Sequence, residues 1–216
     1  MPELSVEALR EEAATFSVAQ SSHNDPYLHG KTDGKTIGTY LERRFQTALR
    51  TKYVYDEGNA ARGIDFPGLN VDMKVTSIKQ PQSSSPFKEV RQKIYGLGYS
   101  LLVFVYEKTD DDSGRTGKLN ILHTIFVDAP RTADFQTTRG ILNIIENDGN
   151  TDDLIAFMHE RNLRIDDDEA YCLAEELLDH PPIQGYLTVS NAYQWRLQYN
   201  RVIQQADTVP GVLRVK

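Results

Sequence analysis

The chain has 216 residues and a mass of 24.5 kDa, which suffices for one domain, or one domain with a modest appendage, around a sizeable apolar core. Hydrophobic residues make up 39% and charged residues 25%, a composition that excludes collagen-like and disordered chains. Cys172 is the only cysteine, which excludes an intrachain disulfide and a cysteine-based zinc site. The acidic N-terminus and the lack of a long apolar run predict a cytoplasmic protein that does not bind membranes.

The net charge of −7 argues at first against a nucleic-acid partner, because phosphate binding requires a basic surface. The acids are concentrated, however, between residues 144 and 181, where twelve acidic residues accompany only two basic ones. That window alone carries −10, so the rest of the chain carries +3. The charge distribution therefore allows DNA binding, provided that the acidic window lies away from the DNA.

The first part of the chain predicts two helices followed by strands. Apolar spacing indicates a helix over residues 5–17 and a second over residues 37–51, where apolar side chains recur every four positions and Thr36 is the expected N-cap. Polar and Gly-rich residues between the helices indicate a loop. Strands are predicted at 53–55, 63–66 and 70–78.

The middle of the chain predicts a crossover between two parallel strands. Residues 80–86 are typical of a loop, residues 87–96 of a helix, and residues 101–107 form the continuous apolar run of a buried strand. Strand, helix and strand in this order imply a right-handed parallel connection. A further strand is predicted over residues 118–127.

The remaining chain looks mainly helical. Helices are predicted at 133–146, 151–162, 167–179 and 190–204, followed by a short extended tail. The whole pattern indicates an α/β (α+β) fold with a central mixed β-sheet flanked by helices and a helical C-terminal part.

Two carboxylates and a lysine form the most informative constellation. Asp72 and Lys74 lie two positions apart on the predicted strand 70–78 and therefore project from the same face, and Asp65 lies across a turn marked by Pro and Gly. Two nearby carboxylates repel each other unless a cation lies between them, and their oxygens suit Mg²⁺. A lysine beside them can orient a water or help to deprotonate it. The set predicts phosphodiester hydrolysis, whereas a solvated ion pair is the structural alternative for Asp72 and Lys74.

The segment IDFPGLNVDMKVTS, followed by KQPQSSSPF, resembles the PD-(D/E)xK nuclease superfamily and, within it, the type II restriction endonucleases. The resemblance covers residues 37–107, whose helix, antiparallel strands, crossover helix and parallel strand follow the order of that family's core. Asp65 matches the first acid, Asp72 the second and Lys74 the lysine. Ile64 is a departure, because the family often has proline at that position.

The resemblance implies a function and a division of the chain. Residues 1–130 would form a restriction-endonuclease-like core with the N-terminal helices, and residues 131–216 a helical region packed on the core that contributes to DNA recognition. The implied activity is Mg²⁺-dependent, sequence-specific cleavage of double-stranded DNA to 5′-phosphate and 3′-hydroxyl ends. Palindromic sites favour a two-fold homodimer.

The resemblance also extends the catalytic set. Asp65 and Asp72 would hold the metal ion together with the backbone carbonyl of Met73, whose side chain is expected in the core. Lys74 would position and activate water. Glu42, on the preceding helix, matches a glutamate that often joins the metal site in the family, although a surface helix charge is the alternative.

Two segments are candidates for DNA recognition. One is the polar loop after the catalytic strand, for which a plain linker is the alternative, and the other is the C-terminal segment, for which an amphipathic terminal helix is the alternative. The candidate DNA-binding residues are Gln80, Gln82, Ser83, Ser84, Ser85, Ser190, Asn191, Gln194, Arg196, Tyr199 and Arg201.

Two further functions remain open at this point. A repair or junction-resolving nuclease of the same fold would act on a DNA structure rather than a sequence. A DNA-binding regulator without catalysis would use the C-terminal segment alone, but it has no need of the intact acid, acid and lysine set.

Overall fold

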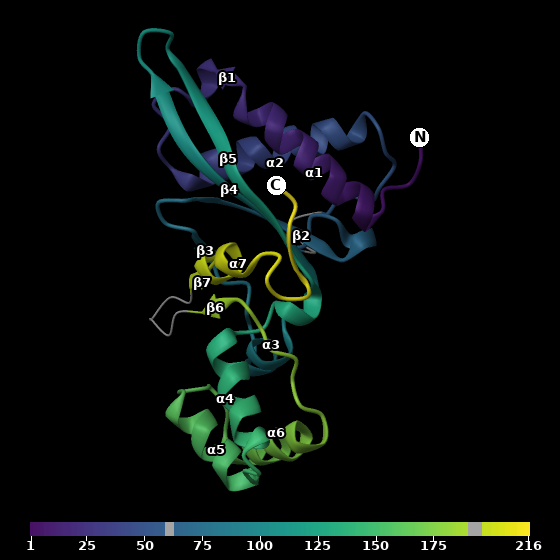
Figure 1. The fold of residues 1–216 in the computed structure, drawn as a ribbon, viewed down its shortest axis with the longest axis vertical. Coiled ribbons are helices and arrows are strands. Elements are labelled where there is room, and N and C mark those ends of the chain that lie inside the picture. The colour runs from purple at the N-terminus through teal and green to yellow at the C-terminus, as the bar shows by residue number, and fades with distance from the viewer. Residues whose placement is uncertain (59–62, 190–195) are drawn as a thin grey trace. The chain divides into compact units, whose positions relative to one another are not determined.

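The computed structural model describes residues 1–58, 63–189 and 196–216, which form two compact units (Figure 1). Unit 1 consists of Met1–Ser83, Ser100–Val127 and Val202–Lys216, and unit 2 of Ser84–Tyr99 and Asp128–Arg201. The predicted boundary after residue 130 falls near the passage from Val127 to Asp128. Each unit nevertheless combines segments that are far apart in the sequence.

Unit 1 contains a mixed sheet in the order β1-β5-β4-β2, with β8 also paired to β5. Strands β4 (Ser100–Asp111) and β5 (Thr116–Val127) form a long antiparallel hairpin (Figure 1). Strand β2 (Val71–Ser77) runs parallel to β4, while β1 (Asn24–Asp25) and β8 (Val212–Arg214) are antiparallel to β5. The predicted mixed sheet and its parallel pair are confirmed.

Two long helices pack on this sheet. Helix α1 (Val6–Ser21) packs against β5, and α2 (Gly34–Arg50) packs against β2. Asp33, rather than the predicted Thr36, caps α2, because its side chain accepts a hydrogen bond of 2.7 Å from the Thr36 backbone N–H. The apolar repeat of α2 faces inward, as predicted.

Some predicted strands are shorter than expected. In the regions 53–55 and 63–66, only isolated bridges form, between Val54 and Glu3 and between Phe66 and Val71. The predicted loop 80–86 instead includes a short strand. The short elements of this part of the chain are the 3-10 helices η1 (Pro26–Leu28) and η2 (Pro67–Leu69) and the strand β3 (Gln82–Ser84).

Unit 2 is mainly helical, and the helices predicted at 87–96, 133–146, 151–162 and 167–179 are confirmed. Its elements up to residue 179 are α3 (Val90–Tyr95), η3 (Ala129–Arg131), α4 (Phe135–Glu146), α5 (Thr151–Glu160) and α6 (Asp167–Asp179). The acidic window of residues 144–181 lies entirely in this unit.

The predicted helix 190–204 is wrong at residues 196–198, which form a strand, and is confirmed at residues 200–204. Strand β7 (Arg196–Gln198) pairs antiparallel with β6 (Thr188–Val189), and α7 is limited to Asn200–Gln205. Leu197 and Tyr199 are buried while the residues beside them are half-buried or exposed, which is the alternation of a strand.

Each unit has its own apolar core. In unit 1, three aromatic rings pack around Phe45, whose ring centroid lies 5.1 Å from that of Phe16, 6.5 Å from that of Phe66 and 5.3 Å from that of Phe104. A separate cluster between α3, α4, α5 and α6 forms the core of unit 2. Among the described residues, no helix combines the length and apolar character needed to cross a membrane.

The aromatic cluster predicts a large loss of stability on truncation. Phe45 is fully buried, so Phe45→Ala removes its ring contacts and leaves a cavity, and we expect the free energy of unfolding to fall by about 3–5 kcal/mol. Urea titration measures this change. Val18→Ala, at an exposed position of α1, is the control and should change the free energy of unfolding by less than about 0.5 kcal/mol.

Candidate active site

A narrow turn brings Asp65 and Asp72 together. Phe66 and Val71 bridge in antiparallel fashion, with N–H to carbonyl distances of 2.9 and 3.2 Å, and Asn70 closes the turn in the left-handed conformation at φ 55°. Phe66 and Val71 are buried in the core. Asp65 directly precedes Phe66 and Asp72 directly follows Val71. The two aspartates therefore occupy opposite positions on the other face of the turn.

The segment that carries Asp65 is fixed at two points. The Met73 backbone N–H donates a hydrogen bond of 2.9 Å to Asp65 Oδ2, and the Gly58 N–H donates one of 2.9 Å to the Asp65 carbonyl. A Cβ at Gly58 would lie 1.8 Å from the Ile64 carbonyl oxygen, so only glycine permits this approach. These contacts orient the Asp65 carboxylate toward β2.

Asp72 and Lys74 form an ion pair on the same face of β2. Lys74 Nζ lies 2.5 Å from Asp72 Oδ2, and the side chain of Lys74 is 24% exposed whereas that of Asp72 is 4% exposed. Asp72 Oδ2 accepts no well-directed hydrogen bond within the described chain, so the contact is chiefly electrostatic. Burial raises the pKa of Asp72 to about 6 and Asp65 adds to the rise, while Lys74 opposes it.

The burial of Asp72 departs from the simple alternation predicted for this strand. Val71, Asp72 and Met73 are all buried, so both faces of this part of β2 are covered. The solvated ion pair considered for Asp72 and Lys74 is therefore excluded for Asp72. A buried carboxylate beside another carboxylate is a costly arrangement and points to a functional site.

Glu42 lies at the contact between α2 and β2. A Cβ on Gly38 would lie 3.9 Å from both Glu42 Oε1 and Val75 Cβ, which places the Glu42 carboxylate over this small residue. Burial raises the pKa of Glu42; Asp65 raises it further and Lys74 lowers it. The charges of Asp65 and Lys74 therefore act on the Glu42 carboxyl. The described residues contain no cluster of three or more His, Cys, Asp or Glu side chains arranged to hold a metal ion.

Met73 contributes its backbone rather than its side chain to this region. Its side chain is 1% exposed and belongs to the core of unit 1, as expected from the sequence. The backbone between Asp72 and Lys74 thus lies directly at the carboxylates, where its N–H already binds Asp65.

The polar segment after β2 folds back onto that strand. The hydroxyl of the buried Thr76 accepts a hydrogen bond of 3.0 Å from the Gln82 N–H and lies 3.2 Å from the Gln82 carbonyl oxygen and 3.4 Å from that of Gln80. Gln80 and Ser84 are exposed, and Gln82 is half-buried. Ser83 is half-buried in unit 1.

Ser85 lies in unit 2 with Ser84, and its Oγ accepts a hydrogen bond of 3.3 Å from the Phe87 N–H. This contact is a local turn hydrogen bond at the start of α3. The segment Gln80–Ser85 is thus ordered by its own backbone and by Thr76, and sequence reasoning missed this role of Thr76. A β-branched hydroxyl on a strand facing a polar loop was the available signal.

The C-terminal candidates are dispersed. Ser190, Asn191 and Gln194 lie outside the described residues. Arg196 is half-buried on β7. Tyr199 is fully buried, which is incompatible with contact to DNA in this conformation, and we do not retain it as a DNA-binding residue.

Arg201 packs inside unit 2. Its guanidinium carbon lies 3.6 Å from the centre of the Phe135 ring, and its Nε is buried without a hydrogen-bond partner among the described residues. This cation-π contact stabilises the start of α4 and leaves only part of the guanidinium available to a partner.

The raised pKa of Asp72 predicts a pH-dependent stability. A carboxyl whose pKa is 3.8 when unperturbed and about 6 in the fold binds its proton more tightly when folded, so the free energy of unfolding falls as pH rises through this window. Asp72→Asn removes the charge, and we expect it to stabilise the metal-free protein at pH 8 by up to about 3 kcal/mol and to have little effect near pH 3.5.

Urea titrations in a chelator-containing buffer at both pH values measure this difference. Asp56→Asn changes an exposed carboxylate in the same unit and is the control. If the two substitutions change the free energy of unfolding equally at pH 8, the charged form of Asp72 is not unfavourable in the folded protein.

Comparisons with known proteins identify the family of this chain. The family described as type II restriction enzyme NspV matches residues 3–214 of the chain. The type II restriction enzyme NspV from Nostoc sp. is 62% identical over 212 residues, which cover 98% of this chain and 96% of that protein. No solved structure matches the chain significantly. With a family match over nearly its whole length and a relative at this identity, the chain belongs to the NspV family of type II restriction enzymes.

Proposed function

We propose that the protein is a Mg²⁺-dependent endonuclease that cuts double-stranded DNA at a short specific sequence and leaves 5′-phosphate and 3′-hydroxyl ends. The observation that carries this proposal is the buried Asp72 carboxylate, which faces Asp65 and pairs with Lys74 at 2.5 Å. The NspV family match supports the same chemistry.

The residues present fit a hard divalent cation. Asp72 Oδ2 is buried and accepts no directed hydrogen bond, so it retains capacity for a further positive partner. Asp65, Asp72 and the Met73 carbonyl supply oxygen atoms, which Mg²⁺ prefers, with waters and a phosphate oxygen as the remaining ligands. When bound, Mg²⁺ supplies charge stabilisation for the phosphate undergoing attack. Two carboxylates and one backbone carbonyl would suffice as protein ligands, so the proposal requires no third carboxylate.

The chain's own groups would then act on water and on the phosphate. Lys74 Nζ, which is partly exposed, would orient the attacking water through a hydrogen bond and favour loss of its proton. The water oxygen forms a bond to phosphorus as the bond to the 3′ oxygen breaks in line, and a proton from solvent neutralises the leaving 3′ oxygen. Glu42, whose pKa is raised chiefly by burial, would accept a hydrogen bond from the same water shell.

DNA recognition is proposed for the two polar segments. The residues retained are Gln80, Gln82, Ser83, Ser84, Ser85, Ser190, Asn191, Gln194, Arg196 and Arg201. Amide and guanidinium groups suit purine edges, and hydroxyls suit phosphates. We further propose a two-fold homodimer acting in the cytoplasm, because a palindromic site presents the same half-site twice.

Loss of either member of the ion pair should abolish cleavage. Asp72→Ala removes a metal-binding carboxylate and Lys74→Ala removes the group that orients water, so we expect rates at least about 10³-fold lower for both variants. The assay incubates each protein with plasmid DNA and Mg²⁺ or excess chelator and sequences the DNA ends. Chelator should abolish cleavage by the wild-type protein.

Asp56→Ala and Lys52→Ala are the matched controls, since both side chains are exposed in the same unit and lie outside the proposed site. Both should cut at the wild-type rate. Retained cleavage by Asp72→Ala or Lys74→Ala would overturn the proposed mechanism, and random ends from the wild-type protein would overturn sequence specificity.

Glu42→Gln should have a smaller effect. The substitution keeps the shape of the side chain but removes a negative charge beside Asp65, so we expect cleavage to fall about 10- to 100-fold while Mg²⁺ dependence is retained. Initial rates at several Mg²⁺ concentrations measure this effect. Glu11→Gln, at an exposed position of α1, is the control, and equal rates for the two variants would remove Glu42 from the site.

A further inference from the structure

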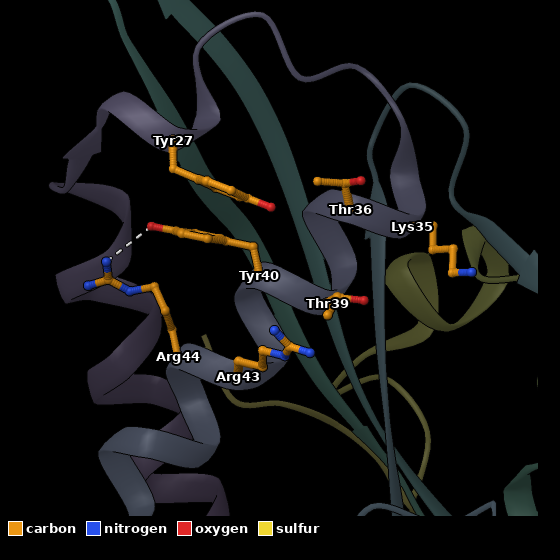
Figure 2. A pocket seen from close by; sticks show the side chains of 7 residues that line it. All are labelled: Tyr27, Lys35, Thr36, Thr39, Tyr40, Arg43 and Arg44. Atoms are coloured by element: carbon orange, nitrogen blue, oxygen red, sulfur yellow. Dashed lines mark hydrogen bonds between the residues drawn. The ribbon is translucent and has the colours of Figure 1, made fainter. Parts of the chain in front are cut away.

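The outer side of α2 carries a feature that the cleavage site does not use. A hollow of about 600 Å³ lies there, lined by Tyr27, Lys35, Thr36, Thr39, Tyr40, Arg43 and Arg44 (Figure 2). All of these residues belong to unit 1, and all but Tyr27 lie on α2. The lining contains three cations and no carboxylate.

One end of the hollow is built from stacked rings. The rings of Tyr27 and Tyr40 lie one over the other, with centroids 5.7 Å apart and planes 13° from parallel (Figure 2). The Tyr40 hydroxyl donates a hydrogen bond of 2.7 Å to Asp25 Oδ2 and accepts one of 3.0 Å from Arg44. Asp25 therefore holds Tyr40 and offsets the charge of Arg44, so this end of the hollow is rigid and close to neutral.

The other end carries charges that have no such partner. Lys35 and Arg43 are exposed, and neither forms an ion pair or hydrogen bond with any residue in the described part of the chain. The nearby carboxylate of Asp33 is occupied as the N-cap of α2. Lys35, Thr39 and Arg43 recur every four positions and thus lie along one stripe of the helix, with a hydroxyl between two cations.

This stripe lies on the same helix as Glu42 of the proposed catalytic site. Arg43 directly follows Glu42, and Thr39 directly follows Gly38, over which the Glu42 carboxylate lies. Successive helix residues are rotated by about 100°, so the stripe lies on the helix flank next to the one that faces β2. The same helix therefore carries both Glu42 and the two unpaired cations.

We propose that this hollow binds a backbone phosphate of the DNA strand, next to the bond that is cut. Lys35 and Arg43 supply the positive charge, Thr39 supplies a hydroxyl, and the stacked tyrosines form a rigid wall for the sugar. A phosphodiester is favoured over a base edge because the free groups are two cations and a hydroxyl, which match a charged phosphate, and the lining contains no Asn or Gln side chain. The inference rests on the proposed function, because it takes DNA as the substrate.

The salt dependence of DNA binding tests the inference. The double variant Lys35→Gln, Arg43→Gln is compared with wild-type protein for binding to a duplex of arbitrary sequence in chelator-containing buffer. Each neutralised phosphate contributes about 0.9 to the slope of log K against log salt, so loss of the one proposed phosphate contact should lower the slope by about 0.9. The matched control is Arg50→Gln, Lys52→Gln, which removes the same charge at and just beyond the other end of α2, where both residues pair with glutamates.

Neutral linkages locate the phosphate. Single methylphosphonates are placed along a duplex that carries the cleavage site, and the dissociation constant is measured for each position. Wild-type protein and the control variant should lose affinity at one or two positions beside the cut, whereas the Lys35→Gln, Arg43→Gln variant should be insensitive there. Equal thermal unfolding temperatures establish that the variants are folded.

The outcomes separate this inference from the proposed function. If the wild-type protein produces defined ends but the two double variants have the same salt slope, the phosphate site is wrong and the nuclease assignment stands. If the wild-type protein produces no defined ends but the slope falls only for Lys35→Gln, Arg43→Gln, the phosphate site stands and sequence-specific cleavage is wrong.

Discussion

The carboxylates of Asp65 and Asp72 occupy opposite positions on one face of a narrow turn, and like charges at such a separation repel each other. The turn cannot relax, because Phe66 and Val71 bridge it and both are buried on the opposite face. Lys74 and the Met73 N–H compensate part of the repulsion. The raised pKa of Asp72, caused first by burial, indicates that this compensation is incomplete. A bound cation would complete this compensation, and the architecture of the turn therefore fits the proposed metal-dependent hydrolysis.

Three faces of helix α2 have different roles in the proposed site. Its apolar repeat, which includes Phe45, anchors the helix in the core of unit 1. At the edge that carries Glu42, burial and Asp65 raise the pKa of the Glu42 carboxyl and Lys74 lowers it. The outer stripe of Lys35 and Arg43 presents unpaired positive charge. One rigid element thereby sets the distance between the place of chemistry and the place where the strand is proposed to be held.

The elements with a strong local pattern were predictable from the sequence. The four-residue repeat predicted α2, and the alternation around Met73 predicted β2 with Asp72 and Lys74 on one face. The burial of Asp72 was not predictable in this way, because alternation along β2 does not indicate that both faces of this part of the strand are covered. The contact of Gly58 with Ile64 likewise depends on how two loops meet.

The C-terminal segment and the two units also depend on contacts between distant segments, which local sequence patterns do not reveal. Polar and aromatic residues around Tyr199 fit a helix or a strand, and only pairing with β6 selects the strand. The sequence predicted one boundary near residue 130, but Ser84–Tyr99 joins unit 2 and Val202–Lys216 joins unit 1 through contacts between segments that no local pattern encodes.

Asp65 and Asp72 lie on one short turn, whereas the basic stripe lies on helix α2, so substitutions in the two places should have different consequences. Asp65 and Asp72, which we propose to hold the metal ion, are close in the sequence, so little chain entropy is lost in bringing their carboxylates together, and their spacing is set within one turn. The basic stripe belongs to a helix whose outer residues have no part in the core. With the phosphate site as proposed, substitutions on that stripe would change the affinity for DNA while Asp65 and Asp72 stay in place. The affinity for DNA and the rate of catalysis would then be able to vary independently.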